Sequence, residues 1–126
     1  MTVRVLVADD QPPFRGAARA VLAATPDFEL VGEASSGEEA VALVGALRPD
    51  VVLMDIKMDG LGGIEATRSI AGAYPETMTV LLSTYREEDL PAQAHDCGAA
   101  AYLHKSNLDG EALRRLWARR QPSSAR

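Results

Sequence analysis

The sequence is poor in cysteine, in long apolar runs and in excess positive charge. Its single cysteine, Cys97, rules out an internal disulfide and suits a reducing compartment such as the cytoplasm. No run of about 18 apolar residues occurs that would cross a membrane as a helix. The net charge is −5, which makes the chain a poor candidate for binding nucleic acid through phosphate contacts. We therefore expect a cytoplasmic chain that binds neither a membrane nor nucleic acid.

No internal repeat or linker divides the chain. Its 126 residues fit one domain, and apolar residues, at 47%, can form a substantial core. The last six residues are polar and lack a hydrophobic pattern. We expect one domain over residues 2–120 and a tail over residues 121–126 that looks like the start of an interdomain linker.

Short apolar or β-branched runs alternate with segments of helical periodicity. Strands are expected at 3–8, 28–33, 51–54, 78–83 and 99–103. Helices are expected at 14–24, from the N-cap Ser36 to just before Pro49, at 64–74, from about Asp89 to Cys97, and at 108–120. Five alternating strand–helix units predict an α/β fold with a doubly wound, five-stranded parallel sheet and helices on both faces. In such sheets the site lies beyond the carboxyl ends of the strands.

The fourth of these helices depends on Pro91. Proline donates no backbone hydrogen bond and is tolerated in the first turn of a helix but not in its interior. We therefore predict that this helix begins late, with Asp89 as its N-cap and residues 85–88 in a loop. Gly98 is the expected C-cap after Cys97.

Polar residues follow four of the five strands at their carboxyl ends. They are Asp9 with Asp10, Asp55, Ser83 with Thr84, and His104 with Lys105. Three converging carboxylates repel one another, and a hard divalent cation such as Mg²⁺ offsets that charge. Lys105 adds a point charge and Ser83 a hydroxyl donor, which together suit phosphoryl transfer to a carboxylate. Taken singly, each residue could be a solvated turn, a cap or a surface lysine; their placement at one edge of the sheet favours a joint site.

Four segments that carry these residues resemble receiver domains of response regulators, the CheY-like superfamily, over residues 2 to about 118. They are Val5–Asp10, Val51–Met58, Val80–Thr84 and Ala101–Lys105. Two further segments, 28–40 and 63–68, look most like the NarL/FixJ/LuxR-type branch. The resemblance implies a flavodoxin-like fold with the sheet order 2-1-3-4-5.

The resemblance also implies a metal site around a phospho-acceptor. Asp55 is the expected acceptor. It would bind Mg²⁺ directly together with Asp10 and the backbone carbonyl of Lys57, while Asp9 would act through water.

Three further residues acquire roles in the same way. After transfer, Ser83 and Lys105 would each contact a phosphoryl oxygen. Ser83 and Tyr102 would form the conformational switch, because Tyr102 stands where the family has its aromatic switch residue.

Three positions depart from the family pattern, which usually has proline at Asp59, often has aspartate at Gly62 and commonly has proline at Ser106. None of them removes a phosphorylation residue. The first two put the stiffness of the loop after Asp55 in question. Asp59 also adds a fourth carboxylate, for which a solvated loop residue is the favoured interpretation.

The function implied is signal reception without enzymatic turnover of a substrate. A histidine kinase would donate the phosphoryl group, and the chain would switch to control an output. Receivers of this branch normally precede a helix-turn-helix DNA-binding domain that regulates transcription, so we favour a receiver fragment of such a regulator. The other interpretation is a stand-alone receiver that acts through protein–protein contacts, and phosphorylation could produce a homodimer in either case.

Rival functions rest on weaker patterns. A flavodoxin-like cofactor binder needs a phosphate loop after the first strand, where this chain has two prolines without N–H donors, Pro12 and Pro13. The intact acidic set argues against a phospho-independent binding module on the same fold. An aspartyl phosphatase would need a second aspartate at Lys57. His95 and His104 lack metal-ligand spacing and are interpreted as structural.

Overall fold

Each β-branched run forms a strand, and the strands pair in parallel in one sheet. The computed structural model describes residues 2–58 and 60–120. Its strands are β1 (Val3–Ala8), β2 (Phe28–Ala34), β3 (Val51–Asp55), β4 (Met78–Ser83) and β5 (Ala101–His104). Their order is β2-β1-β3-β4-β5, which confirms the expected topology. The expectations for Asp59 and for the tail 121–126 lie outside the described residues.

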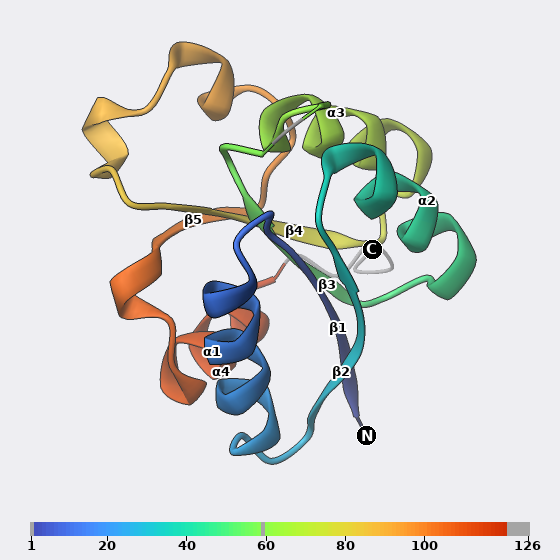
Figure 1. Cartoon of the computed structure of the whole chain (residues 1–126), viewed down its shortest axis with the longest axis vertical. Helices are drawn as coiled ribbons and strands as arrows, with labels where there is room; N and C mark the ends of the chain where they lie inside the picture. The colour runs from blue at the N-terminus through green and yellow to red at the C-terminus, as the bar shows by residue number, and fades with distance from the viewer. Residues whose placement is uncertain (1, 59, 121–126) are drawn as a thin grey trace.

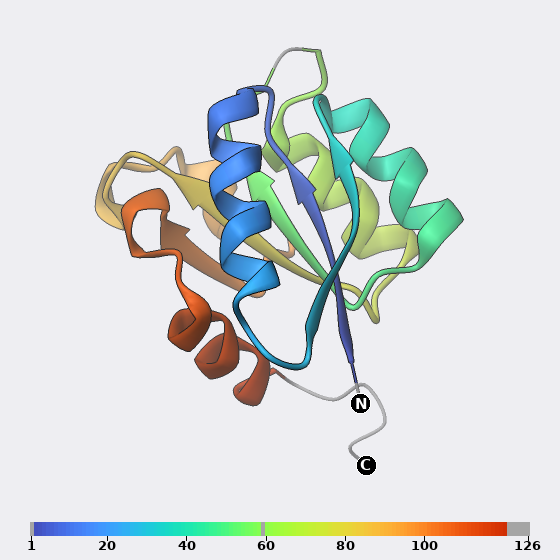
Figure 2. The same ribbon diagram turned by 60° about the horizontal axis from the view of Figure 1, so that its bottom comes forward.

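Helices cover both faces of the sheet, as the alternating pattern predicts. The α-helices are α1 (Pro12–Ala23), α2 (Gly37–Leu47), α3 (Gly63–Ala73) and α4 (Gly110–Ala118). Figure 1 shows α1 and α4 on one face and α2 and α3 on the other. Figure 2 shows the arrowheads of the parallel strands pointing toward one edge of the sheet, where the loops that follow them gather. Among the described residues, no helix is long and apolar enough to cross a bilayer.

The period-two alternation of β3 divides the core between the two faces. Val52 and Met54 pack in the cluster that includes α2 and α3, whereas Val51 and Leu53 pack in the cluster that includes α1 and α4. The strand is buried along its whole length, because parallel strands with helices on both faces have no solvent side. Asp55 is the last residue of this strand and is held by the same packing.

The ends of α2 follow the sequence signals with one change. The Ser36 hydroxyl accepts the N–H of Glu39 at 3.1 Å, as expected for an N-cap. The Glu39 carboxylate, however, accepts from the N–H of Ser35 at 2.8 Å, one residue earlier than in a reciprocal capping box. Arg48 has a φ of 49° and ends the helix before Pro49.

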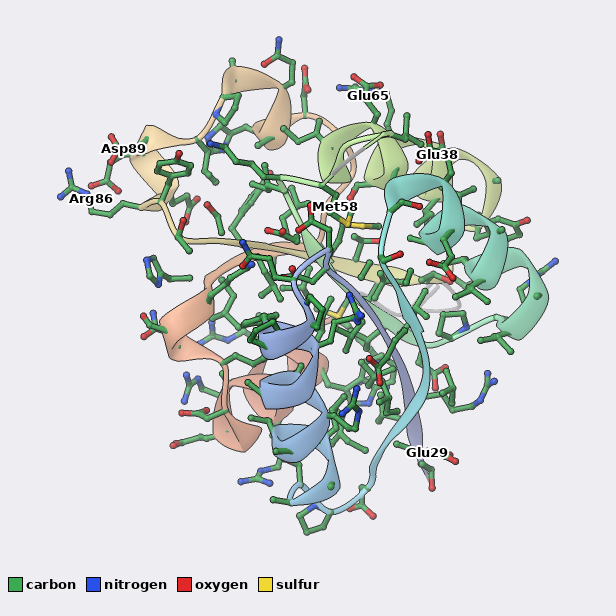
Figure 3. All side chains as sticks on the ribbon, in the orientation of Figure 1. Glu29, Glu38, Met58, Glu65, Arg86 and Asp89 are labelled. Carbon is green, nitrogen blue, oxygen red and sulfur yellow. The ribbon has the colours of Figure 1, made fainter. Side chains whose placement is uncertain are left out.

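The prediction of an α-helix between β4 and β5 is wrong. Two short 3₁₀ turns stand there, η1 (Glu87–Asp89) and η2 (Ala92–His95). Leu90 has a ψ of 152°, because the ring of the following proline disfavours helical geometry in the residue before it. Pro91 itself is also extended, with a ψ of 150°. Asp89 is therefore part of η1 rather than an N-cap. Figure 3 shows the Arg86 and Asp89 side chains of this segment projecting away from the sheet.

Other boundaries shift by one or two residues. α1 begins two residues early, at Pro12, because proline fits the first helical position. β5 begins two residues late, at Ala101, after Gly98, whose φ is +95°. α4 begins after Asp109, whose carboxylate accepts the N–H of Ala112 at 2.8 Å.

Candidate functional site

Three carboxylates converge at the carboxyl edge of the sheet. Asp55 ends β3, and Asp9 and Asp10 directly follow β1, the neighbouring strand. One carboxylate oxygen from each residue lies within 4.8 Å of the others. Asp9 and Asp55 are buried and Asp10 is half-buried. The predicted grouping of these three residues is therefore present, at the point where the strand order reverses.

Lys105 enters the same cluster from the loop after β5. Its Nζ lies 2.6 Å from Oδ2 of Asp9 and 3.3 Å from Oδ1 of Asp55. The expected point charge is therefore present, and its shorter contact is to Asp9. The lysine also lies 4.5 Å from the centre of the Phe14 ring, a cation–π contact that sequence reasoning did not identify.

Oxygen ligands in this arrangement fit a hard divalent cation. Mg²⁺ prefers a few carboxylates and keeps several waters, and the half-buried Asp10 leaves the cluster open to solvent on one side. Lys105 offsets one of the three negative charges, so the ionised group keeps a net charge of −2. The donor set is therefore compatible with Mg²⁺.

The Asp55 carboxyl titrates unusually. Burial raises its pKa from 3.8 to about 6, the Asp9 carboxylate acts in the same direction, and Lys105 and the N–H of Lys57 oppose both. A carboxyl group whose pKa is raised by folding contributes to the stability of the fold while it is protonated, at low pH. That contribution is lost as the pH rises through the folded pKa.

This shift predicts a pH-dependent difference between the wild type and Asp55→Asn. In the presence of a chelator, wild-type stability relative to the variant should fall as pH rises from 3.8 to about 6 and stay level above that range. Chemical denaturation of both proteins across this pH series measures the difference. Stability curves that run parallel throughout would contradict the assignment of the shift to Asp55.

Ser83 is the last residue of β4 and follows Leu82, the register partner of Asp55. It is buried, and its hydroxyl oxygen accepts the N–H of Tyr85 at 2.9 Å. Among residues 2–58 and 60–120, its own O–H has no acceptor and is available to donate. A pocket of about 120 Å³ is lined by Asp55, Ser83 and Lys105 and by the exposed Lys57 and Tyr85, whose Nζ and hydroxyl are 2.7 Å apart.

Tyr102 lies in β5 and does not line this pocket. Its hydroxyl donates a hydrogen bond to the carbonyl of Ala94 in η2, and burial raises its pKa. Ser83 and Tyr102 both line a larger cavity of about 360 Å³ that extends beneath η1 residues Glu87 and Glu88. The two predicted switch residues are thus connected by one cavity.

His104 links the ends of β4 and β5. Its Nε2 is 2.9 Å from the carbonyl oxygen of Thr84, and its Nδ1 accepts the N–H of Ser106 at 3.1 Å. With Nδ1 accepting, Nε2 carries the proton and donates to Thr84. The ring therefore joins the loop of Ser83 to the loop of Lys105, the kind of structural role that its sequence context favoured.

Close backbone packing holds the loop after Asp55. A Cβ on Gly63 would lie 2.0 Å from the carbonyl oxygen of Asp55. Both carboxylate oxygens of Glu38 accept the N–H of Leu61 at 3.0 Å, and this lowers the pKa of Glu38. Gly62 adopts an extended conformation that any residue can take.

Comparison with known proteins agrees with this geometry. Residues 5–116 match the model of the response regulator receiver domain. The response regulator UvrY of Escherichia coli O157:H7 is 43% identical over 111 residues, which cover 88% of this chain and 51% of that protein. The response regulator GacA of Pseudomonas viridiflava is 41% identical over 103 residues, covering 82% and 48% of the two chains. The chain spans about half the length of these curated relatives.

Solved structures show the same fold. The signal receiver domain of the putative response regulator NarL from Mycobacterium tuberculosis superposes with a TM-score of 0.86 at 32% identity, covering 94% of this chain and 98% of that one. A LuxR-family two-component response regulator from Aurantimonas sp. SI85-9A1 gives a TM-score of 0.84 at 30% identity, covering 98% and 91%. The chain therefore belongs to the response regulator receiver domains of two-component systems, among relatives of the NarL/LuxR family.

Proposed function

We propose that this receiver accepts a phosphoryl group from a histidine kinase on Asp55, with Mg²⁺ as cofactor, and then switches conformation to control an output. The observation that carries the proposal is the convergence of Asp9, Asp10, Asp55 and Lys105 on one edge of the sheet. A carboxylate nucleophile beside oxygen ligands and a fixed cation suits phosphoryl transfer, in which positioning and charge neutralisation dominate.

The transfer step uses one oxygen of Asp55. That oxygen attacks the phosphorus of a phosphohistidine, the P–N bond breaks, and its electron pair stays on the imidazole nitrogen. Asp55 and Asp10 would hold Mg²⁺ directly with the backbone carbonyl of Lys57, and Asp9 would do so through water. Bound there, the cation would offset the repulsion among the carboxylates and neutralise phosphoryl oxygens.

Lys105, Ser83 and Tyr102 connect the phosphoryl group to the rest of the fold. Lys105 would exchange part of its contact with Asp9 for a phosphoryl oxygen, and Ser83 would donate its free O–H to another. Ser83 would thereby move toward Asp55 and change the cavity that it shares with Tyr102. The phosphorylated form would then favour a second arrangement of Tyr102 and of the turns after β4, a local charge event that biases a bistable element.

The output lies outside the chemistry of this site. Residues 2–120 would form the receiver, and residues 121–126 would begin a linker to a helix-turn-helix transcription-factor domain. GacA and UvrY are named response regulators, and the matched residues cover about half of each of them. A stand-alone receiver in the cytoplasm that binds a protein partner, or dimerises when phosphorylated, is the second arrangement. The domain would act as a signalling device that takes part in its own phosphorylation and dephosphorylation, rather than as an enzyme with a separate substrate.

Intact mass spectrometry tests the proposal. After incubation with a small acyl phosphate and Mg²⁺, the chain should gain one acid-labile adduct of about 80 Da, the mass of one phosphoryl group. With a chelator in place of Mg²⁺, the adduct should be lost. An adduct that forms equally well with the chelator would remove Mg²⁺ from the proposal.

The lifetime of the adduct should depend on Lys57 and Tyr85. Hydrolysis needs a water molecule in line with the P–O bond, and these two hydrogen-bonded side chains line the pocket at Asp55. Neither carries a carboxylate or amide that could orient the water. The Lys57→Asn, Tyr85→Ala double variant should therefore lose its phosphoryl group several-fold faster than the wild type, a barrier change of about 1 kcal/mol.

This rate is measured on phosphorylated protein freed of phosphodonor, with Mg²⁺ present. Arg86→Ala serves as the control, because Arg86 is exposed and does not line this pocket. Equal or slower decay in the double variant would show that the two side chains do not restrict the approach of water.

A further inference from the structure

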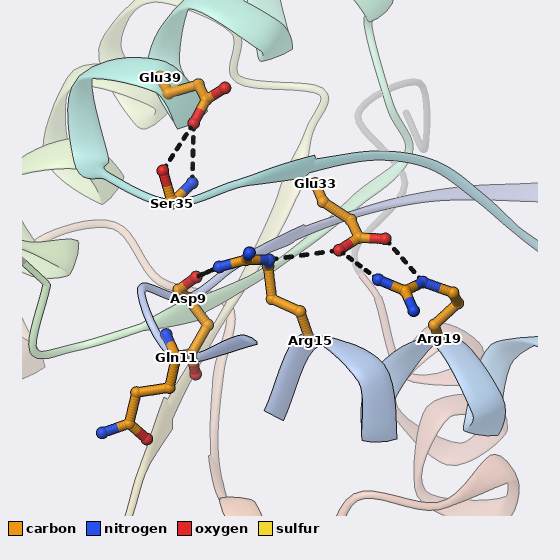
Figure 4. Close-up of polar contacts among 7 residues, drawn as sticks. All are labelled: Asp9, Gln11, Arg15, Arg19, Glu33, Ser35 and Glu39. Atoms are coloured by element: carbon orange, nitrogen blue, oxygen red, sulfur yellow. Dashed lines mark hydrogen bonds and ion pairs between the residues drawn. The ribbon is translucent and has the colours of Figure 1, made fainter. Parts of the chain in front are cut away.

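A charged network connects α1 and β2 to the acidic cluster. The Glu33 carboxylate in β2 accepts two hydrogen bonds from Arg19, both 2.9 Å long, and lies 3.3 Å from Nε of Arg15 (Figure 4). Arg15 and Arg19 stand four residues apart on α1 and therefore share a face of the helix. The hydrogen bonds from Arg19 hold the pKa of Glu33 below its ordinary value. Glu33 is thus a charged partner for both arginines.

Arg15 differs from Arg19 in reaching the site. Its Nη1 donates a hydrogen bond of 2.7 Å to the main-chain carbonyl oxygen of Asp9, as Figure 4 shows. The N–H of Asp9 donates to the carbonyl oxygen of Ala34 at 2.9 Å. Both peptide groups that flank Asp9 are therefore fixed, one by β2 and the other by Arg15. The side chain of Arg15 is only 21% exposed, compared with 58% for Arg19.

The orientation of Asp10 depends on this arrangement more than that of Asp9 does. The Asp9 carboxylate is held by the N–H of Gln11 at 2.8 Å and by Lys105 at 2.6 Å. In the part of the chain that the structure describes, the Asp10 carboxylate has no hydrogen bond or ion pair. The backbone alone therefore determines the point from which this side chain reaches the cluster, and the carbonyl oxygen of the peptide that precedes Asp10 is the one that Arg15 binds.

We propose that Arg15, paired with Glu33, is a positioning residue that orients Asp10 toward the divalent cation by fixing the Asp9–Asp10 peptide. This inference rests on the proposed Mg²⁺ site. It adds to that site a residue that does not bind the cation and acts through the main chain of Asp9. Groups that orient metal ligands from outside the coordination sphere commonly change metal affinity by about 10- to 100-fold. The planar guanidinium suits the role, because it binds Glu33 and the carbonyl oxygen of Asp9 at the same time.

An ordinary surface ion pair makes the opposite prediction for metal affinity. If Arg15 acted only through its charge, its removal would reduce the repulsion of a cation and strengthen Mg²⁺ binding. If Arg15 positions Asp10, its removal should weaken Mg²⁺ binding although a positive charge has been lost. The sign of the change therefore separates the two roles.

Calorimetric titration of the metal-free chain with Mg²⁺ measures this change. Arg15→Ala should weaken binding about tenfold. Arg19→Ala is the matched control. It also removes one positive charge and a contact to Glu33, but it removes no contact to Asp9. The Mg²⁺ affinity of this variant should therefore equal or exceed that of the wild type. Arg15→Lys keeps the charge but not the fork, and should still bind Mg²⁺ several-fold more weakly than the wild type.

A second measurement follows phosphorylation by a small acyl phosphate. For Arg15→Ala the Mg²⁺ concentration at half-maximal rate should rise by the same factor, and saturating Mg²⁺ should restore the rate. Should Arg15→Ala not fold, Arg15→Lys decides the question alone. Unchanged or tighter Mg²⁺ binding in the Arg15 variants, beside clear binding by the wild type, would overturn the positioning role only. A wild-type chain that binds no Mg²⁺ would overturn the metal site and this inference together.

Discussion

Asp55→Asn should abolish the phosphoryl adduct completely and should leave the chain folded. The amide lacks the nucleophilic oxygen of the carboxylate but has nearly the same size, so the packing at the end of β3 is retained. The substitution also removes one of three clustered negative charges, the one whose pKa is raised to about 6 by burial and by Asp9. Without Mg²⁺, the variant should therefore melt at or above the wild-type temperature at neutral pH.

The measurement is intact mass after incubation with Mg²⁺ and a small acyl phosphate. Asp89→Asn is the control, since Asp89 is exposed in η1, where it pairs with Arg86. It makes the same chemical change away from the cluster and should keep the full adduct. An adduct of unchanged yield in Asp55→Asn would mean that another residue accepts the phosphoryl group.

Gly63→Ala should destabilise the fold by about 3 kcal/mol or more, the upper range for overpacking a buried position. The new Cβ would lie 2.0 Å from the carbonyl oxygen of Asp55 and 2.9 Å from Cα of Ile56. Both are backbone atoms that no change of side-chain rotamer can move away. Either the start of α3 or the end of β3 must shift, so phosphorylation of Asp55 should slow as well.

Gly72→Ala provides the comparison for this prediction. Gly72 lies on the same helix, and a Cβ there would meet nothing within 4 Å. Alanine is favoured over glycine inside a helix by about 0.5–1 kcal/mol, so this variant should be slightly more stable than the wild type. Urea unfolding of both variants gives the two free energies. A loss for Gly63→Ala below about 1 kcal/mol would show that the backbone relaxes easily around Asp55.

The parts of the fold that sequence predicted are those that depend on local pattern. β3 is recognisable because Val51, Val52 and Leu53 form an apolar run too short for a helix. The location of the site follows from this strand assignment, because the residues that follow parallel strands all lie at the same edge of the sheet. The grouping of Asp9, Asp10 and Asp55 was therefore predictable before any distance was known.

The features that the sequence did not predict are those for which several backbone conformations or hydrogen-bond partners compete in the folded structure. The helix expected to begin near Asp89, with Pro91 in its first turn, does not form, because Leu90 and Pro91 are both extended. Lys105 was expected at the acidic site and does contact Asp55, but its shorter contact, to the buried Asp9, was not predicted. The reach of Arg15 to the carbonyl of Asp9 carries no sequence signal, because that acceptor is a backbone group which every residue possesses.

The two short turns between β4 and β5 also determine how this part of the molecule opens. Each is closed by only a few local bonds, such as those from Asp89 to the carbonyl of Arg86 at 3.0 Å and from Ala94 to the carbonyl of Pro91 at 3.0 Å. A continuous α-helix would release its row of bonds cooperatively, as one unit. η1 and η2 are instead closed by separate bonds. A change at Ser83 would therefore have to break only the few bonds of the nearer turn, while the farther turn is held by the hydrogen bond that Tyr102 donates to the carbonyl of Ala94.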